Sequence, residues 1–209
     1  SSLASLRAST AIALGLAVCL LPTSAFAHSP VPGFAGFYTG LLHPLSTPGQ
    51  LLGLLSLGLM LGLRWPQWFA WSWLWFAASC LLGIILGQLG FMATWSELVL
   101  LLLAASAAAL AALYPSGIRA VCFAFSGICG FLSGVLSTPD PGPLNDTIIT
   151  LSGSFVGANF ALIYAAGGIG WLQERYTQQW LRIGIRVVAA WIAAISVLSA
   201  LLALATQQP

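Results

Sequence analysis

Long apolar stretches separated by short polar segments account for most of the chain. Six of these stretches approach the length of about 20 mostly apolar residues that a helix needs to cross a bilayer. We place them at about 49–63, 68–91, 97–113, 119–137, 147–170 and 186–205. The connections between them carry proline, glycine or charged residues, which are typical of loops. The pattern therefore predicts an all-α transmembrane protein whose spanning helices form a six-helix bundle.

Residues 1–27 form a separate, signal-like segment. Arg7 gives it a positive start, an apolar run covers residues 11–21, and Ala25-Phe26-Ala27 fits the small-x-small pattern of a signal-peptide cleavage site. Cleavage at that point would leave His28 as the first residue of the mature chain. If the segment is retained instead, it forms a seventh helix with a cytoplasmic N-terminus. We favour cleavage.

Residues 28–48 are predicted to be an outer-face segment with a His-Pro motif, and residues 49–209 to be one helical membrane domain. The outer-face segment is too short and too interrupted to span. We expect a short interfacial helix from Phe34 to Leu42, stopped by His43-Pro44, because proline interrupts helical hydrogen bonding. The longest internal connection is expected at about 171–185, as a loop or a surface helix.

The composition requires a lipid bilayer as partner. Hydrophobic residues make up 59% of the chain and charged residues only 5%, against about a quarter in a soluble domain. Six basic and four acidic side chains cannot cover the surface of a soluble protein of 209 residues. The basic residues are scattered arginines and form no stripe that would neutralise phosphates, so no nucleic acid is expected as a partner.

The arginines predict the orientation of the helices. Lysine and arginine near the ends of spans favour the cytoplasmic side, and the chain contains no lysine. With the mature N-terminus outside, the arginines on the inner side are Arg64, Arg119, Arg175, Arg182 and Arg186, and the acids on the outer side are Glu97, Asp140 and Asp146. Both mature termini would then face outward, in an inner (plasma) or internal membrane of bacterial type.

Pairs of glycines four residues apart lie within four of the spans. They are Gly58 and Gly62, Gly83 and Gly87, Gly130 and Gly134, and Gly153 and Gly157. Small residues at this spacing let two helix backbones approach closely in lipid. The partner helix can belong to the same chain or to another subunit, and the pattern leaves both uses open.

Few polar residues lie inside the predicted spans. Gln88 and Asn159 are candidates either to line a pathway or to pack, and for Asn159 we favour an interhelical hydrogen bond. His28 and His43 are at most two ligands of a weak metal site on the outer face, where an ordinary loop histidine is the favoured interpretation. The chain carries no nucleotide-binding loop, nucleophile elbow or zinc-protease helix. We expect no enzymatic activity and no cofactor.

Two helix starts show capping patterns. Thr94 and Glu97 have the spacing of a capping box at the start of the third span. Asn145 or Asp146 suits the N-cap position of the fifth span. The patterns predict structural roles for these residues.

The segment from Gly40 to Gly58 resembles the signature of the HupE/UreJ family. These are small membrane proteins of hydrogenase and urease gene clusters, regarded as nickel or cobalt permeases. The family pattern is a His-Pro pair, a glycine, and an Asp-His pair that opens the first span. His43 and Pro44 match it, whereas Gly49 and Gln50 stand at the Asp-His positions. Histidines that the resemblance implies are also absent from residues 125–130 and 164–168.

The resemblance implies two functions of different kinds. The favoured one is a non-enzymatic accessory or structural subunit, which keeps the family scaffold without its ligands and packs against other membrane protein subunits. The alternative is a divergent nickel or cobalt permease whose path is lined by backbone carbonyls, serines, Gln88 and Asn159. The ligand-type residues that remain are His28, His43 and at most Glu97, so for the favoured function we expect only weak nickel or cobalt binding at an outer-face site of His28 and His43.

Overall fold

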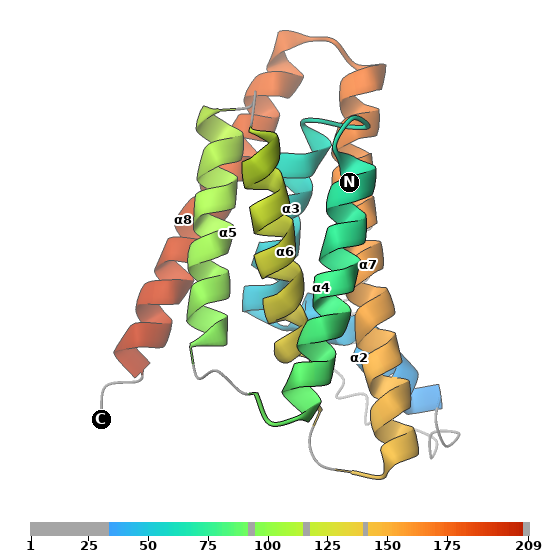
Figure 1. Ribbon diagram of the computed structural model, residues 1–209. Coiled ribbons are helices and arrows are strands. Elements are labelled where there is room, and N and C mark those ends of the chain that lie inside the picture. Colours follow the sequence, from blue (N-terminus) through green and yellow to red (C-terminus); the bar gives the residue numbers. More distant parts are fainter. Residues whose placement is uncertain (1–33, 92–94, 115–117, 140–141, 207–209) are drawn as a thin grey trace, which may run out of the picture. The chain divides into compact units, whose positions relative to one another are not determined.

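A computed structural model describes residues 34–91, 95–114, 118–139 and 142–206, all of which belong to one compact unit (Figure 1). The signal-like segment and His28 lie outside the described residues. The described elements are all helices: α2 (Phe34–Ser46), α3 (Pro48–Gly62), α4 (Phe69–Gln88), α5 (Ser96–Leu113), α6 (Arg119–Val135), α7 (Leu144–Arg175) and α8 (Gln179–Thr206). The all-α class is confirmed for this part of the chain.

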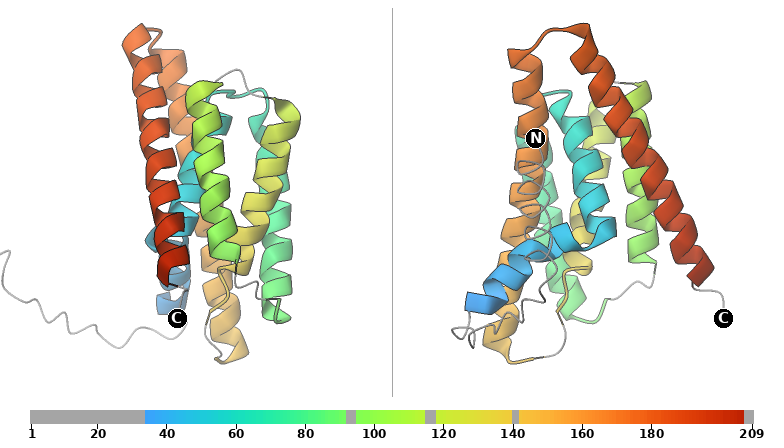
Figure 2. Two further views of the ribbon diagram at one scale, coloured as in Figure 1. Left: turned by 90° about the vertical axis from the view of Figure 1, so that its left-hand side faces the viewer. Right: turned by 180° about the vertical axis from the view of Figure 1, so that it is seen from behind.

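α3 lies at the centre of the unit and contacts each of the other six helices. Around it, α4 packs on α6, α2 packs on α7, and α5 packs on α8 (Figure 2). Most residues of α3 are buried, and the helix is apolar on nearly every side. A helix that is apolar all round belongs in the interior of a bundle. The first span of the sequence is therefore the core helix.

α2 and α3 meet at an angle of 69°. The expectation that His43-Pro44 ends the helix is wrong, because α2 continues through Pro44 to Ser46. The break comes at Thr47, whose backbone is extended and which precedes Pro48. A residue before proline is sterically excluded from the helical region. The hydroxyls of Ser46 and Thr47 both donate to the carbonyl of His43, at 3.0 Å each, and satisfy the end of α2.

The connection between α7 and α8 is much shorter than expected. α7 runs to Arg175 and α8 starts at Gln179, so the predicted loop at 171–185 is wrong. Residues 171–175 contain neither proline nor glycine, and nothing in them stops the helix. α7 also starts earlier than expected, with Pro143 at its N-cap, which places Asn145 and Asp146 inside the first turn. Asp146 still suits that position, because carboxylates stabilise helix N-termini.

The helix start predicted for the third span is shifted by one residue. α5 begins at Ser96 with Trp95 at its N-cap and has no side-chain cap hydrogen bond, while Thr94 lies outside the described residues. Glu97 is therefore the second residue of α5 instead of the third, and it contributes a negative charge to the first turn.

The glycine pairs serve the chain's own bundle. A Cβ at Gly134 would collide with the carbonyl of Cys80, and one at Gly83 with the carbonyl of Phe131, so α4 and α6 touch backbone to backbone. Gly153 and Gly157 meet α2 in the same way. The remaining pair, on α3, lies against Ala165, Ala166 and Ile169 of α7. The question that the pattern left open is thus answered for all four pairs.

Four helices, α4, α5, α7 and α8, are long and apolar enough to cross a bilayer alone, and the bent pair of α2 and α3 would make a fifth. By length and composition, the described helices therefore provide at most five spans, one fewer than the six predicted. α3 has 15 residues and α6 has 17, whereas about 20 are needed for a full crossing. α3 can be short because it is enclosed by the other helices and α2 continues it.

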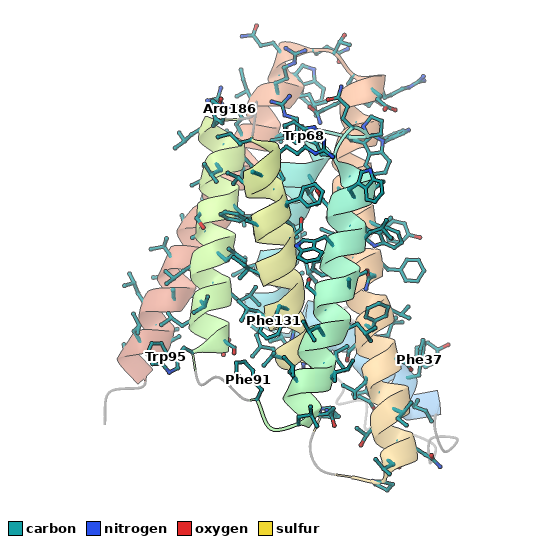
Figure 3. All side chains as sticks on the ribbon, viewed as in Figure 1. Phe37, Trp68, Phe91, Trp95, Phe131 and Arg186 are labelled. Carbon is teal, nitrogen blue, oxygen red and sulfur yellow. The ribbon has the colours of Figure 1, made fainter. Side chains whose placement is uncertain are left out.

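The arginines gather at one end of the described unit. Arg64 lies between α3 and α4, Arg119 starts α6, and Arg175 ends α7. Arg182 and Arg186 lie in the first turns of α8, and Figure 3 shows Arg186 and Trp68 at the same end. Phe91 and Trp95 lie at the opposite end, beside the start of α5. This is the distribution on which the predicted orientation depends.

Candidate functional site

The two polar residues predicted inside the membrane lie on different helices, Gln88 on α4 and Asn159 on α7. Gln88 is the last residue of α4 and is exposed, and its role as a pathway or packing residue stays a prediction. Asn159 is buried, but its Nδ2 donates to the carbonyl of Phe155 in its own helix at 2.8 Å. The expected interhelical hydrogen bond is therefore not made, and Asn159 Oδ1 has no hydrogen-bond partner.

His43 is not a loop residue. It lies within α2, half-buried, with its Nε2 3.2 Å from the carbonyl oxygen of Leu136, just beyond the end of α6. Glu97 is near this region, since a Cβ on Gly49 would lie 3.2 Å from its Cγ. In the described ranges no three His, Cys, Asp or Glu side chains lie close enough together to hold a metal ion.

Gln50 was not identified as a candidate site residue from the sequence. It lies in the first turn of α3, is 0% exposed, and neither Oε1 nor Nε2 has a hydrogen-bond partner. Buried amides are nearly always hydrogen-bonded, because an unpaired one loses its hydration without replacement. The signal in the sequence was one amide within a long apolar run, at a position where the resemblance places a histidine.

The neighbours of Gln50 can be read from a contact one turn further along α3. Gly53 packs against Leu100 of α5 and Cys129 of α6. α3 runs parallel to α5, as Gly49 beside Glu97 shows, and antiparallel to α6, since Leu57 lines the same small void as Phe125. One turn back along α3 therefore corresponds to one turn back along α5 and one turn forward along α6.

From this register we infer that three buried polar side chains, Gln50, Ser96 and Ser133, lie at a similar depth of the bundle, and we call them the Gln50 layer. Ser96 precedes Leu100 by four residues and Ser133 follows Cys129 by four, so each keeps the inward face of its helix. Ser96 is 2% exposed and Ser133 is 0% exposed. Ser96 Oγ has no hydrogen-bond partner. The Ser133 hydroxyl neighbours the Cys129 thiol and has no nitrogen or oxygen partner.

The structure describes neighbours of the layer toward both ends of the bundle. Toward the arginine end, the void between α3, α5 and α6 is lined by Ser56, Leu57, Ala107 and Phe125 among others and leaves no room for a water molecule. Ser56 and Ser126 turn their hydroxyls back onto carbonyls of their own helices, at 3.0 and 2.8 Å. Toward the other end, the contact of His43 with Leu136 joins α2 to α6.

A separate groove of about 680 Å³ opens between α2, α3 and α7. Its lining is apolar and includes Leu42, Leu54, Phe160 and Tyr164. Phe160 and Tyr164 are also well exposed. Apolar side chains exposed on spanning helices are expected to face lipid, so this groove is part of the lipid-facing surface.

Apolar helices of spanning length, backbone contacts through glycine and a central broken helix define a multi-pass α-helical membrane protein. The family model described as HupE / UreJ protein matches residues 16–201, which is most of the chain. The chain therefore belongs to the HupE/UreJ family. No curated protein and no solved structure matches it.

Proposed function

We propose that this protein is a transport-related member of its family and that the Gln50 layer is its solute-binding site. The observation that carries the proposal is the buried, unpartnered amide of Gln50 directly after the break between α2 and α3. Transporters commonly build their sites at broken helices, where the interrupted backbone and nearby polar groups meet the solute. A buried polar group without a partner is costly in a bilayer and points to a function.

The chemistry of the layer differs from that of a site for bare nickel or cobalt. An amide and two hydroxyls are neutral, whereas nickel and cobalt favour imidazole and carboxylate ligands. The layer therefore suits a small polar solute or a metal ion that keeps its hydration shell. Gln50 stands where the family resemblance has a histidine, so the solute would be held more weakly at this position.

Uptake into proteoliposomes tests the proposal. The full chain, reconstituted and offered nickel or cobalt chloride, should load the vesicles above the level of protein-free controls. Gln50→Leu should abolish the uptake, because it keeps the volume and removes the amide. Ser126→Ala is the matched control, since Ser126 is buried but bonded to its own helix. Uptake that is absent in wild type, or unaffected by Gln50→Leu, contradicts the proposal.

The second candidate is the accessory-subunit role, and α8 favours it. Only 17% of its spanning window is buried, the least of the four long spans. Trp191, Leu198 and Leu202 are well exposed along it, and a neighbouring subunit could cover them. The glycine pairs no longer support this role, since they are used within the chain. Purification in mild detergent should then recover a partner that is lost in a Trp191→Ala variant.

Neither role requires covalent bonds to be made or broken. We therefore propose that the protein is not an enzyme. We further propose that the arginine end faces the cytoplasm in an inner or internal bacterial-type membrane, with both mature termini outside. The gathering of Arg64, Arg119, Arg175, Arg182 and Arg186 at one end supports this orientation. In that orientation the Gln50 layer is nearer to the outer face.

A further inference from the structure

A groove of about 330 Å³, separate from the one on α2, α3 and α7, lies between the end of α5 and the first half of α8. Its lining residues are Ala112, Leu113, Ile183, Arg186, Val187 and Ala190. Leu113, Ile183 and Val187 are well exposed. Because both helices are long and apolar enough to span a bilayer, these side chains are expected to contact lipid. The groove therefore presents an apolar wall together with one arginine.

A hydrogen bond fixes Arg186 at this groove. Its Nε donates to the carbonyl oxygen of Ala112, itself a lining residue, at 2.6 Å. A guanidinium has five N–H donors, and within the described residues Arg186 makes no other hydrogen bond and no ion pair. The four remaining donors, on the two terminal nitrogens, are thus available to a ligand. A guanidinium in this state can bind two oxygens of a phosphate side by side.

The charge around the groove favours an anion. Arg182 lies four residues before Arg186, so the two side chains are neighbours on the exposed surface of α8. Neither the first turn of α8 nor the lining of the groove contains an acidic residue. The acid of this end, Glu174, lies in the last turn of α7. Trp180 is well exposed at the start of α8, and tryptophan at a span end is typical of headgroup depth.

We propose that this groove binds one anionic phospholipid, with its phosphate on Arg186 and Arg182 and an acyl chain against the apolar wall. A lipid fits both parts of the groove, whereas a free phosphate would leave the apolar wall uncovered. Basic residues at the membrane surface attract anionic lipids, and basic pockets between spanning helices bind their headgroups. The proposal is independent of the transport and accessory roles, because it depends on α5 and α8 and on no residue of the Gln50 layer.

Native mass spectrometry of the full chain in detergent tests the site. Phosphatidylglycerol is compared with phosphatidylethanolamine, whose ammonium group cancels the charge of its phosphate, and with inorganic phosphate. Wild type should bind one phosphatidylglycerol in preference to phosphatidylethanolamine. Arg186→Gln should weaken phosphatidylglycerol binding about fivefold, which corresponds to the contribution of one basic residue near anionic lipid. Arg119→Gln is the matched control, because it removes the same charge at the same end, yet its guanidinium lies over the Phe123 ring of its own helix.

Ala190→Phe tests the apolar wall without changing the charge. The larger side chain should fill the groove and weaken the binding of both lipids several-fold. If Arg186→Gln fails to fold, Arg182→Gln is the replacement, with a smaller reduction expected because Arg182 does not line the groove. Equal binding of the two lipids by wild type, or equal losses in Arg186→Gln and Arg119→Gln, would overturn the lipid site. It would also be overturned if inorganic phosphate displaced the lipid, or if a dimer of the chain formed and was lost in Ala190→Phe.

Discussion

The guanidinium of Arg186 donates from Nε to the carbonyl oxygen of Ala112 at a distance of 2.6 Å. Arg186 lies near the start of α8 and Ala112 in the last turn of α5, so the bond joins two helices at the arginine end. The last carbonyls of a helix have no partner within the helix. Arg186 therefore caps α5, and the same residue is one of the five arginines on which the proposed orientation depends.

Arg186→Ala should destabilise the protein by about 1 kcal/mol, because a hydrogen bond from a charged donor is lost while the carbonyl regains some contact with water. Arg182→Ala is the matched control. Arg182 lies one turn earlier on α8 and is exposed, and its loss should change stability by less than about 0.5 kcal/mol. Thermal unfolding in the same detergent measures the difference. Equal effects of the two substitutions would show that the bond contributes nothing.

The glycines offer a second matched pair. Gly134→Ala should destabilise by about 3 kcal/mol or more, since its Cβ would meet the backbone of Cys80 and the two helices would have to separate. Gly168→Ala should be neutral or stabilise by up to about 1 kcal/mol, because nothing lies within 4 Å and alanine favours the helix. Chemical or thermal unfolding of both variants checks this. A Gly134→Ala protein as stable as wild type would mean that α4 and α6 are not packed as described.

Much of this fold follows from local pattern. Apolar runs, proline and glycine located the helices, and the chemistry of small residues located the close contacts, although not their partners. The errors arose where a local signal competes with its surroundings. His43-Pro44 predicted a helix end, yet the end came at Thr47 because of the next proline. The start of α7 likewise lay ahead of the residues that suit a cap.

The site was harder to predict than the fold. Gln50 is one amide in an apolar run, and sequence alone does not reveal that its side chain is enclosed without a partner. Ser96 and Ser133 join it only because α3 runs parallel to one neighbour and antiparallel to the other. The resemblance had directed attention to missing histidines instead of to the residue that replaces one of them. Burial and hydrogen bonding, which depend on three helices at once, define the layer.

The orientation can be tested at two connections. Pro139 lies between α6 and α7, and Gln178 lies between α7 and α8, at opposite ends of α7. In a Cys19→Ala background, the other cysteines are buried and should react slowly. A membrane-impermeant thiol reagent added outside should label Pro139→Cys and not Gln178→Cys, because arginines near the ends of spans favour the cytoplasmic side and the second connection lies at the arginine end. Labelling of both from one side, or the reverse pattern, would overturn the proposed topology.

The last prediction concerns metal. After chelator washing, the purified protein should hold no stoichiometric nickel or cobalt within its membrane-spanning part. Gly49 and Gln50 occupy the positions of the Asp-His pair, and within the described segments no three His, Cys, Asp or Glu residues come together. A divalent ion in hydrocarbon has to replace its hydration with several strong ligands, which neutral amides and hydroxyls do not provide. His43 already directs Nε2 to the carbonyl of Leu136, which leaves Nδ1 for a weak outer-face site together with His28.

Elemental analysis of wild type and of His43→Ala tests this prediction directly. Before washing, wild type should show at most substoichiometric nickel or cobalt, and His43→Ala should show less, because only the outer-face site is affected. After washing, both should be empty. Gln50→His provides a positive control, since an imidazole at the position where the family resemblance has a histidine would restore a ligand type that these metals prefer. One tightly held metal per chain that survives the loss of both His28 and His43 would show that a bare ion binds inside the bundle, and it would require ligands other than those described for the Gln50 layer.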